Sequence, residues 1–293
     1  MDQAGVLREM KTSVVPSAIR QKRHNGNTRV IAITSGKGGV GKTNISANFA
    51  YLFSKMGKRT LLLDADAGLA NIDVILGITP KYNLHHVLSG EKSLSQAVVE
   101  GPGGVKILPA SSGIPEMTSL SKGQKFTLLE ELDGLDEDFD FMFIDTAAGI
   151  ADNVMYFNMV AGEIIVVATP EPTSLTDAYA LIKVLYQGYA ARRFMLLVNM
   201  AQNSNEAEGV YTRLSNATNQ FLDLPIEYLG YIPRDQNVSK AVRKQKLLSD
   251  IFPDSKASKS MSEIVKNLCQ KQPGDYENGT IKFFDRSIIE KND

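Results

Sequence analysis

A glycine-rich segment between an apolar run and a helical pattern has the residue types needed to bind phosphate. Residues 36–43 read GKGGVGKT and fit the pattern GxxxxGK[ST]. Glycines let successive backbone N–H groups turn toward one anion without Cβ clashes, and the following helix presents its N-terminus to that anion. The last lysine of such a loop reaches the β- and γ-phosphates, and the hydroxyl after it binds Mg²⁺. The predicted nucleotide contacts in this loop are Gly36, Lys37, Gly38, Gly39, Val40, Gly41, Lys42, Thr43 and Asn44.

Carboxylates follow two apolar runs, and each could serve phosphate chemistry with magnesium. Asp64 and Asp66 end the run that begins at residue 60, and alternation along a strand places both side chains on one side. Carboxylates at the carboxyl end of a strand can hold a magnesium-bound water or orient an attacking water. Asp145 ends the run FMFID, which is the Walker B pattern, and would act on Mg²⁺ through a water. The predicted metal-site residues are Thr43, Asp64 and Asp145.

Two further strand ends could hold the base of a nucleotide. Asn199 ends one apolar run and has an amide that could hydrogen-bond an adenine edge. The next run ends in Pro233, Arg234 and Asp235. The guanine signature NKxD is not found in the sequence, which favours ATP over GTP. All four residues could also be ordinary turn residues.

The elements that must position these residues alternate along the chain. Short apolar runs rich in β-branched residues are separated by helical patterns, which predicts an α/β fold with a doubly wound, mostly parallel sheet and helices on both faces. The predicted strands are 30–34, 60–64, 105–109, 141–145, 164–169, 194–199 and 226–232, and the predicted helices are 43–56, 173–189, 205–222 and 258–271.

Composition limits the classes of protein to consider. Of 293 residues, 43% are hydrophobic and 22% are charged, as in ordinary globular proteins rather than disordered or fibrous ones. Lys plus Arg number 32 and Asp plus Glu number 33, so the net charge of −1 gives no general argument for nucleic-acid binding. Cys269 is the single cysteine, which excludes an intrachain disulfide or an iron–sulfur cluster held by one chain. We expect a cytoplasmic chain without a membrane span.

The phosphate loop resembles the deviant loop of the MinD/ParA family of ATPases. In that family a lysine at the position of Lys37 crosses a homodimer interface and contacts the partner's nucleotide, so the resemblance implies a catalytic trans-acting cation and a nucleotide-sandwich homodimer. The segment DADAGLANID, residues 64–73, is similar to the family's switch I segment. Carried over, Asp66 orients the lytic water, Lys42 is catalytic, and Asp64 supports Mg²⁺ and its waters. The resemblance also places adenine at residues 199 and 233–235, and thus implies ATP and Mg²⁺ as cofactors.

Within that family the chain looks like the MinD branch, and in particular the regulators of flagellar number called FlhG, FleN or YlxH. The segment TPEPTSLTDAY, residues 169–179, supports this branch, and the start DQAGVLR is similar to that branch's DQAxxLR segment. The resemblance implies that this segment forms a helix that activates the GTPase FlhF. Flagellar switch-ring proteins and a flagellar transcription regulator are further implied partners. The predicted partner-binding residues are Asp2, Gln3, Ala4, Leu7 and Arg8, with Gln3 entering the GTPase site.

The C-terminus carries a candidate membrane-binding helix. In this branch an amphipathic terminal helix binds membrane when the ATP dimer forms, which implies a peripheral location at the inner face of the cell membrane. Four apolar side chains of the last segment fall on one side of a helical wheel, although Asp285 falls among them and Phe283 lies opposite. These predicted membrane residues are Ile281, Phe284, Ile288 and Ile289. The chain then divides into residues 1–28 (activating helix and basic linker), 29–272 (ATPase domain) and 273–293 (linker and membrane helix).

Three other functions are compatible with a fold of this kind. A ParA-type ATPase that binds DNA non-specifically for partitioning is the main alternative, and ATP-dependent, salt-sensitive DNA retention would support it. The DQAxxLR start and the amphipathic end argue against it, so no nucleic-acid partner is expected. An iron–sulfur ATPase lacks the required cysteines. A bacterial tyrosine kinase would need a tyrosine-rich tail, and only Tyr276 lies beyond residue 231.

Overall fold

The computed structural model describes residues 28–66, 71–110, 119–135, 138–189 and 191–271. The predicted partner-binding residues of the N-terminus and the predicted membrane residues of the C-terminus lie outside these ranges. The predicted ATPase domain, 29–272, is therefore described except for residues 67–70, 111–118, 136–137, 190 and 272.

The described residues form one eight-stranded sheet with the order β3-β4-β2-β5-β1-β6-β7-β8. All neighbouring strands are parallel except β3, which pairs antiparallel with β4 at one edge. The strands are β1 (Arg29–Ser35), β2 (Thr60–Ala65), β3 (Val99–Glu100), β4 (Lys106–Leu108), β5 (Phe141–Ala148), β6 (Glu163–Ala168), β7 (Phe194–Ala201) and β8 (Glu227–Pro233).

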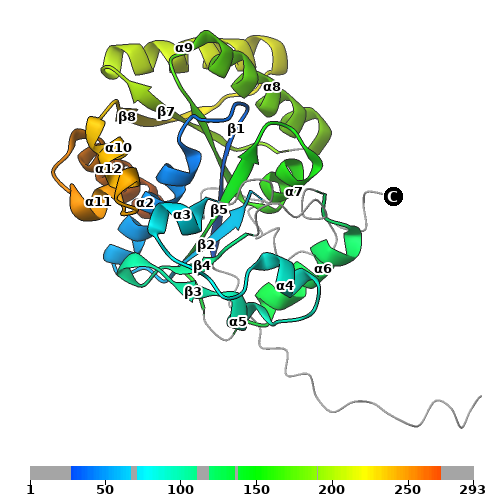
Figure 1. Cartoon of the computed structure of the whole chain (residues 1–293). Helices are drawn as coiled ribbons and strands as arrows, with labels where there is room; N and C mark the ends of the chain where they lie inside the picture. The colour runs from blue at the N-terminus through cyan, green and yellow to red at the C-terminus, as the bar shows by residue number, and fades with distance from the viewer. Residues whose placement is uncertain (1–27, 67–70, 111–118, 136–137, 190, 272–293) are drawn as a thin grey trace, which may run out of the picture.

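Helices connect the strands and cover both faces of the sheet, as Figure 1 shows. They are α2 (Lys42–Lys55), α3 (Ile72–Leu76), α4 (Leu84–Leu88), α5 (Leu94–Ala97), α6 (Lys122–Asp133), α7 (Asp152–Val160), α8 (Pro172–Tyr189), α9 (Ser204–Leu222), α10 (Gln236–Arg243), α11 (Leu248–Ile251) and α12 (Lys256–Gln270), with one 3-10 turn, η1 (Pro102–Gly104).

Alternation along the central strand divides the core between these two faces. Ile31 and Ile33 of β1 pack in the cluster formed with α2 and α12, whereas Val30 and Ala32 pack in the cluster beneath α4 to α7. A third cluster joins α8 and α9 to β6 and β7. Every residue of β1 is buried, as a parallel strand covered on both faces requires. The predicted doubly wound α/β fold is confirmed.

Differences from the predicted elements have physical causes. The four predicted helices correspond to α2, α8, α9 and α12, and the other described helices were not predicted. In α7 seven of the nine residues are buried, so the helical period is hard to see in the sequence. The terminal helix begins at Lys256 rather than 258, since the Ser255 hydroxyl accepts the Ser258 N–H as an N-cap. Across the described part of the chain, none of the helices is long and apolar enough to cross a bilayer.

Candidate functional site

The phosphate loop leaves β1 and enters α2 where the carboxyl ends of the parallel strands meet. Two of its glycines are needed because atoms of other elements lie too close for a Cβ. A Cβ on Gly36 would lie 2.2 Å from the Asp177 carbonyl oxygen in α8, so only glycine lets the loop pass this backbone. Gly41 has a φ of 93°, and a Cβ there would lie 2.5 Å from the Asn199 amide nitrogen. The loop shape thus depends on α8 and β7 as well as on its own residues.

Asn199 lies beside this loop and bonds to it. Its Nδ2 donates to the Val40 carbonyl at 2.7 Å, and its Oδ1 accepts the Met200 N–H at 2.9 Å. The side chain is buried at the end of β7. In the described structure Asn199 therefore holds the phosphate loop against β7, and an adenine contact by its second amide hydrogen remains a prediction.

Lys42 begins α2 and is buried, with 8% of the residue exposed. Its Nζ donates to Ser35 Oγ at 2.9 Å, and that hydroxyl donates to the Lys37 carbonyl at 2.7 Å. Burial lowers the pKa of Lys42, while the carboxylates of Asp145 and Asp66 act in the opposite direction. Burial thus outweighs the two carboxylates, and the pKa of Lys42 is lowered on balance.

Asp145 lies at the base of the loop with two hydroxyl donors. Ser46 Oγ donates to Asp145 Oδ1 at 2.9 Å, and the Thr43 hydroxyl also bonds to this carboxylate. Complete burial raises the pKa of Asp145 to about 6, although the bonds to Thr43 and Ser46 and the charge of Lys42 lower it. The Walker B aspartate therefore contacts the loop hydroxyl that the motif assigns to magnesium.

Asp64 stands beside Asp145 on the neighbouring strand, because the two residues are register partners of the parallel β2–β5 pair. Its Oδ1 accepts the Asp66 N–H at 3.1 Å, and its Oδ2 accepts the N–H groups of Asn71 and Ile72 at 3.3 Å each. Burial and the Asp145 carboxylate raise the pKa of Asp64 well above its usual range, despite these backbone donors.

The donor set at this edge fits a magnesium ion. Two buried carboxylates and the Thr43 hydroxyl supply hard oxygen ligands, and Mg²⁺ in such sites keeps several waters rather than an all-protein shell. A divalent cation would relieve the unfavourable burial of the adjacent Asp64 and Asp145 carboxylates. No group of three or more His, Cys, Asp or Glu side chains suited to a metal is found within the described ranges.

Lys37 points away from its own loop toward the start of α8. Its Nζ bonds to Glu171 Oε2 at 2.6 Å and to Thr173 Oγ1 at 3.1 Å. Both partners of the ion pair are accessible, with 38% of the Lys37 side chain and 63% of the Glu171 side chain exposed. The bond to Lys37 lowers the pKa of Glu171. Lys37 is thus accessible at the surface, whereas Lys42 is buried.

Next to Glu171 a small cavity of about 90 Å³ opens between the ends of β6, β7 and β8. Thr169 and Arg234, which follow β6 and β8, line this cavity. The Thr169 hydroxyl is buried and has no hydrogen-bond partner among the described residues. Sequence reasoning identified Arg234 here but missed Thr169, whose only signal was its place at a strand end. The full lining is Thr169, Pro170, Glu171, Met200, Gln202, Glu206 and Arg234.

Asp235 bonds to the backbone of two helices in the described structure, and its predicted adenine contact stays a prediction. Its Oδ1 accepts the Asn237 N–H at 2.8 Å and caps α10, and its Oδ2 accepts the Ala257 N–H at 3.2 Å. Pro233 ends β8 opposite Ala201. Asp235 thus joins two helices, and its carboxylate is directed to their backbone N–H groups.

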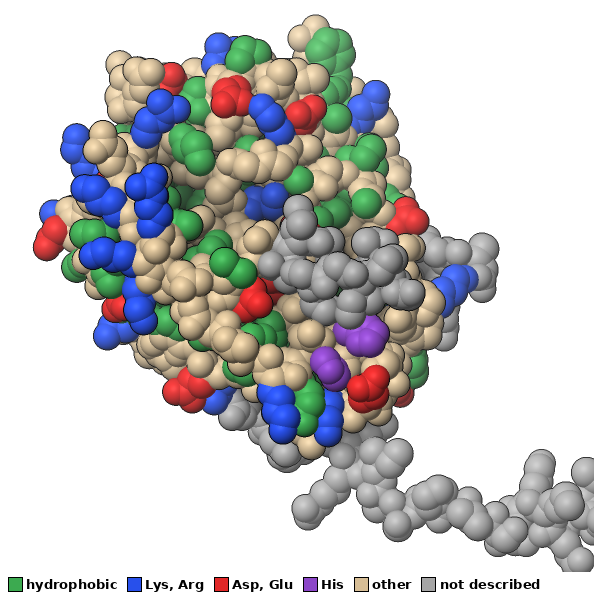
Figure 2. Space-filling model, in the orientation of Figure 1, with side chains coloured by type: hydrophobic (Ala, Val, Ile, Leu, Met, Phe, Trp, Pro, Cys, Tyr) green, Lys and Arg blue, Asp and Glu red, His purple; other side chains and the backbone are tan. Residues whose placement is uncertain are grey.

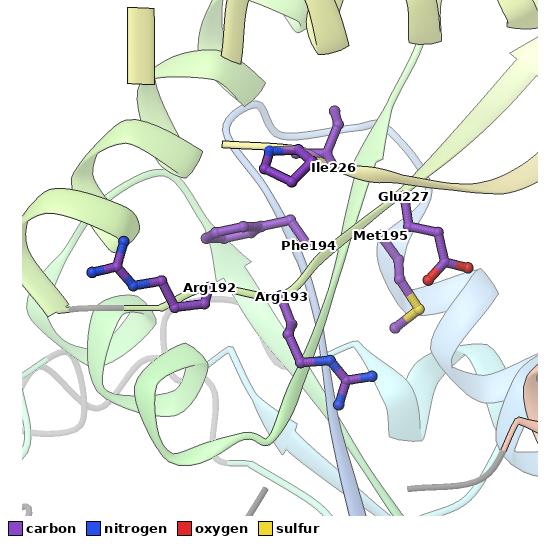
Figure 3. A pocket seen from close by; sticks show the side chains of 7 residues that line it. Arg192, Arg193, Phe194, Met195, Ile226 and Glu227 are labelled. Atoms are coloured by element: carbon purple, nitrogen blue, oxygen red, sulfur yellow. The ribbon is translucent and has the colours of Figure 1, made fainter. Parts of the chain in front are cut away.

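A larger cavity of about 240 Å³ lies at the other end of the strands and is shown in Figure 3. Phe194 and Glu227, which begin β7 and β8, line it with the arginines that precede β7. Arg192 stacks on the Tyr186 ring and Arg193 lies 3.9 Å from Glu163, so the two arginines point in different directions. This cavity is separate from the phosphate loop, which lies at the carboxyl ends of the strands.

The fold and this edge of the sheet define a P-loop nucleotide-binding protein with a Walker B aspartate. Residues 31–248 match the family described as the CobQ/CobB/MinD/ParA nucleotide binding domain, and the chain belongs to that family. It is accordingly a MinD/ParA-type ATPase.

Two relatives share most of their length with the chain. The antiactivator FleN of Pseudomonas aeruginosa is 42% identical over 262 residues, which cover 89% of this chain and 94% of that protein. The flagellum site-determining protein YlxH of Helicobacter pylori is 36% identical over 249 residues, covering 85% and 84%.

Solved structures of MinD agree with the fold. The cell division ATPase MinD of Pyrococcus furiosus matches with a TM-score of 0.69 and 26% identity, over 82% of this chain and 98% of that one. MinD of Pyrococcus horikoshii, solved with Mg-ADP, matches with a TM-score of 0.69 and 27% identity, over 83% and 96%.

Proposed function

We propose that the chain is an ATP- and Mg²⁺-dependent switch that controls the number or placement of flagella. The observation that carries the proposal is the pairing of a complete phosphate loop with an exposed Lys37 at its rim. Similarity to the antiactivator FleN and to the flagellum site-determining protein YlxH supports the flagellar role. The MinD structure with Mg-ADP supports the cofactors.

The chemistry assigned to the site follows from the residues. Lys42 and the loop amides would bind the phosphates, and Thr43, Asp145 and Asp64 would hold Mg²⁺ with its waters, which supplies charge neutralisation on the phosphates. Asp66, half-buried beside Asp64, would orient the attacking water. Lys37 would leave Glu171 and contact the nucleotide of a second subunit, so that hydrolysis requires the dimer.

The output of this ATPase would be its location. We propose that the ATP-bound dimer binds the membrane reversibly through residues 273–293, with contacts from Ile281, Phe284, Ile288 and Ile289. Liposome co-sedimentation with ATP, ADP or no nucleotide tests this, comparing the full chain with one that ends at Gly279. ATP-dependent pelleting that is lost on truncation is expected, and no pelleting in any state would contradict the membrane step.

Residues 1–28 would connect the switch to a GTPase partner. We propose that Asp2, Gln3, Ala4, Leu7 and Arg8 dock on FlhF and stimulate its GTP hydrolysis. Deletion of residues 1–11 should abolish this stimulation and leave ATP hydrolysis intact. If stimulation persists without these residues, the partner assignment is wrong. Flagellar switch-ring proteins and a flagellar transcription regulator remain candidate partners for the same cycle.

DNA binding of the ParA type is the alternative function. The sequences of the two terminal segments favour the membrane switch. DNA retention that needs ATP and falls with salt would support partitioning. The same liposome assay separates the two, because a partitioning ATPase would not pellet with lipid.

A further inference from the structure

A basic surface lies on α10 and the turn that follows it. Between residues 236 and 249 the chain contains four cationic residues and no Asp or Glu, in a protein whose net charge is −1. All four side chains are exposed, and within the described residues none of them forms an ion pair. Figure 2 shows Lys and Arg side chains gathered on the side of the molecule that α10 to α12 form. We call this set the α10 basic surface, and its members are Lys240, Arg243, Lys244 and Lys246.

The turn at the end of α10 contains a strained residue. Gln245 has a φ of 51°, a left-handed conformation that glycine usually adopts at this place after a helix. The Gln245 N–H bonds to the Val242 carbonyl and the Lys246 N–H to the Ala241 carbonyl, which is the Schellman pattern. Unlike glycine, glutamine at this position has a side chain that can bond to a neighbouring element.

That side chain bonds to the helix next to the nucleotide site. Gln245 Nε2 donates to the Val74 carbonyl of α3 at 3.0 Å, and its Cβ packs close to Gly77 at the end of α3. The start of α3 in turn donates the Asn71 and Ile72 N–H groups to the Asp64 carboxylate. One line of contacts therefore joins a predicted magnesium carboxylate to the α10 basic surface.

We propose that the α10 basic surface is a docking site for an acidic segment of a partner protein, and that nucleotide state controls it through α3 and Gln245. Charge complementarity specifies the chemistry of the partner. Val74 lies beside the turn with 56% of its surface exposed, so the site also offers an apolar contact.

A protein partner fits better than the other polyanions. Lys240 and Arg243 lie on α10 and the other two cations follow it, so the set extends over only about 9 Å. That length spans about three phosphates of one DNA strand, fewer than the roughly 6–10 phosphate contacts of a strongly salt-dependent DNA-binding protein. Helices that bind membrane surfaces insert exposed aromatic or leucine side chains next to their cations. Here Phe252, the aromatic residue beneath Lys244, is partly buried. The affinity for the acidic segment does not depend on the proposed function, but its nucleotide dependence does.

The test uses the full chain and a fluorescein-labelled peptide in which Glu and Asp alternate with Leu and Ala. Anisotropy titrations at low salt with Mg-ADP or a non-hydrolysable ATP analogue give the affinity in each state. The variant K240E/R243E/K244E should weaken binding by about tenfold or more. The control K183E/R213E/K266E makes the same change of charge at exposed cations of α8, α9 and α12. It should change the peptide affinity less than about twofold.

Three results would overturn the docking site. They are equal loss in the control variant, no peptide binding by the unmodified chain, and preferential binding of duplex DNA or phosphatidylserine vesicles through the same three cations. Gln245→Gly tests the link to α3, because glycine suits the turn but removes the amide. It should keep peptide binding and lose the difference between the two nucleotide states.

Failure of the link through Gln245 and failure of the proposed function give different results. If nucleotides bind normally, as measured with a fluorescent ATP analogue, and peptide affinity still does not differ between states, the link through Gln245 is wrong. If nucleotides do not bind, the proposed function fails while the peptide result still decides the docking site. By linkage, an effective peptide should also change the affinity for ATP by the same factor.

Discussion

Asp64 and Asp145 are direct neighbours across two parallel strands, although 80 residues separate them in the sequence. Neighbouring strands lie about 4.8 Å apart, so two buried carboxylates face one position at the edge of the sheet. Burial raises the pKa of both groups, and the Asp145 carboxylate raises the pKa of Asp64 further. A divalent cation is the ligand that this pair can accept at lowest cost.

The stability of the metal-free protein should therefore fall as pH rises from about 4 to about 6. The folded state binds the Asp145 proton more tightly than the unfolded state does, because the pKa rises from 3.8 to about 6. The loss is on the order of 3 kcal/mol at neutral pH and is absent below the unfolded pKa. Urea unfolding of the nucleotide-free chain with EDTA across this range measures it.

Asp145→Asn is the matched variant for this effect. The amide keeps an acceptor for Ser46 and carries no charge, so the fall between pH 4 and pH 6 should become smaller, and added Mg²⁺ with nucleotide should no longer stabilise. An unchanged pH profile in this variant would mean that Asp145 does not carry the buried charge.

Gly36→Ala should damage the phosphate loop by a steric effect. The added Cβ would meet the Asp177 backbone at 2.2 Å, so α8 or the loop must move. We expect a loss of about 1–3 kcal/mol in unfolding free energy together with weaker ATP binding. Gly38→Ala is the control in the same loop, since no atom lies within 4 Å of its new methyl group. Equal losses of unfolding free energy in both variants, measured by urea unfolding, would contradict the packing explanation. Fluorescent-nucleotide titration of Gly36→Ala measures the loss of ATP binding.

Lys37→Ala should separate nucleotide binding from turnover. The side chain bonds to Glu171 and Thr173 rather than within its own loop, and exposed pairs of this kind contribute little to stability. We expect normal folding and ATP binding, loss of the ATP-dependent dimer in light scattering, and a fall in phosphate release by roughly 10³-fold, as for an arginine finger. Normal dimerisation and turnover would exclude a role across the interface.

Asp66→Ala should arrest the cycle after ATP binding. Asp66 follows β2 and is half-buried beside the Asp64 carboxylate, where it can reach a water near the phosphates. Loss of a group that positions the attacking water typically lowers the rate by about 10²–10⁴-fold. Single-turnover hydrolysis and chromatography with ATP should show slow hydrolysis and a persistent dimer. Turnover at the unmodified rate would remove Asp66 from the catalytic step.

Local features of the sequence determined the fold class and the phosphate loop. The motif at residues 36–43 has a steric basis that involves few residues, and fully apolar runs separated by helical patterns are specific to parallel sheets. The strand ends that carry Asp64 and Asp145 could be read for the same reason. Helix α7 could not be predicted from the sequence, because burial on nearly all sides removes the periodic pattern of apolar residues.

Strand order and loop packing decided which side chains are neighbours in the site, because they bring together residues that are distant in the chain. Only the tertiary structure pairs β2 with β5 and so makes Asp64 and Asp145 neighbours. It also places Asn199 on the Val40 carbonyl, where the sequence had suggested an adenine contact alone. The bond from Gln245 to Val74 spans 171 residues and has no local signature. The sequence thus indicated which residues could take part in chemistry. Which atoms each side chain contacts depended on how the sheet is assembled.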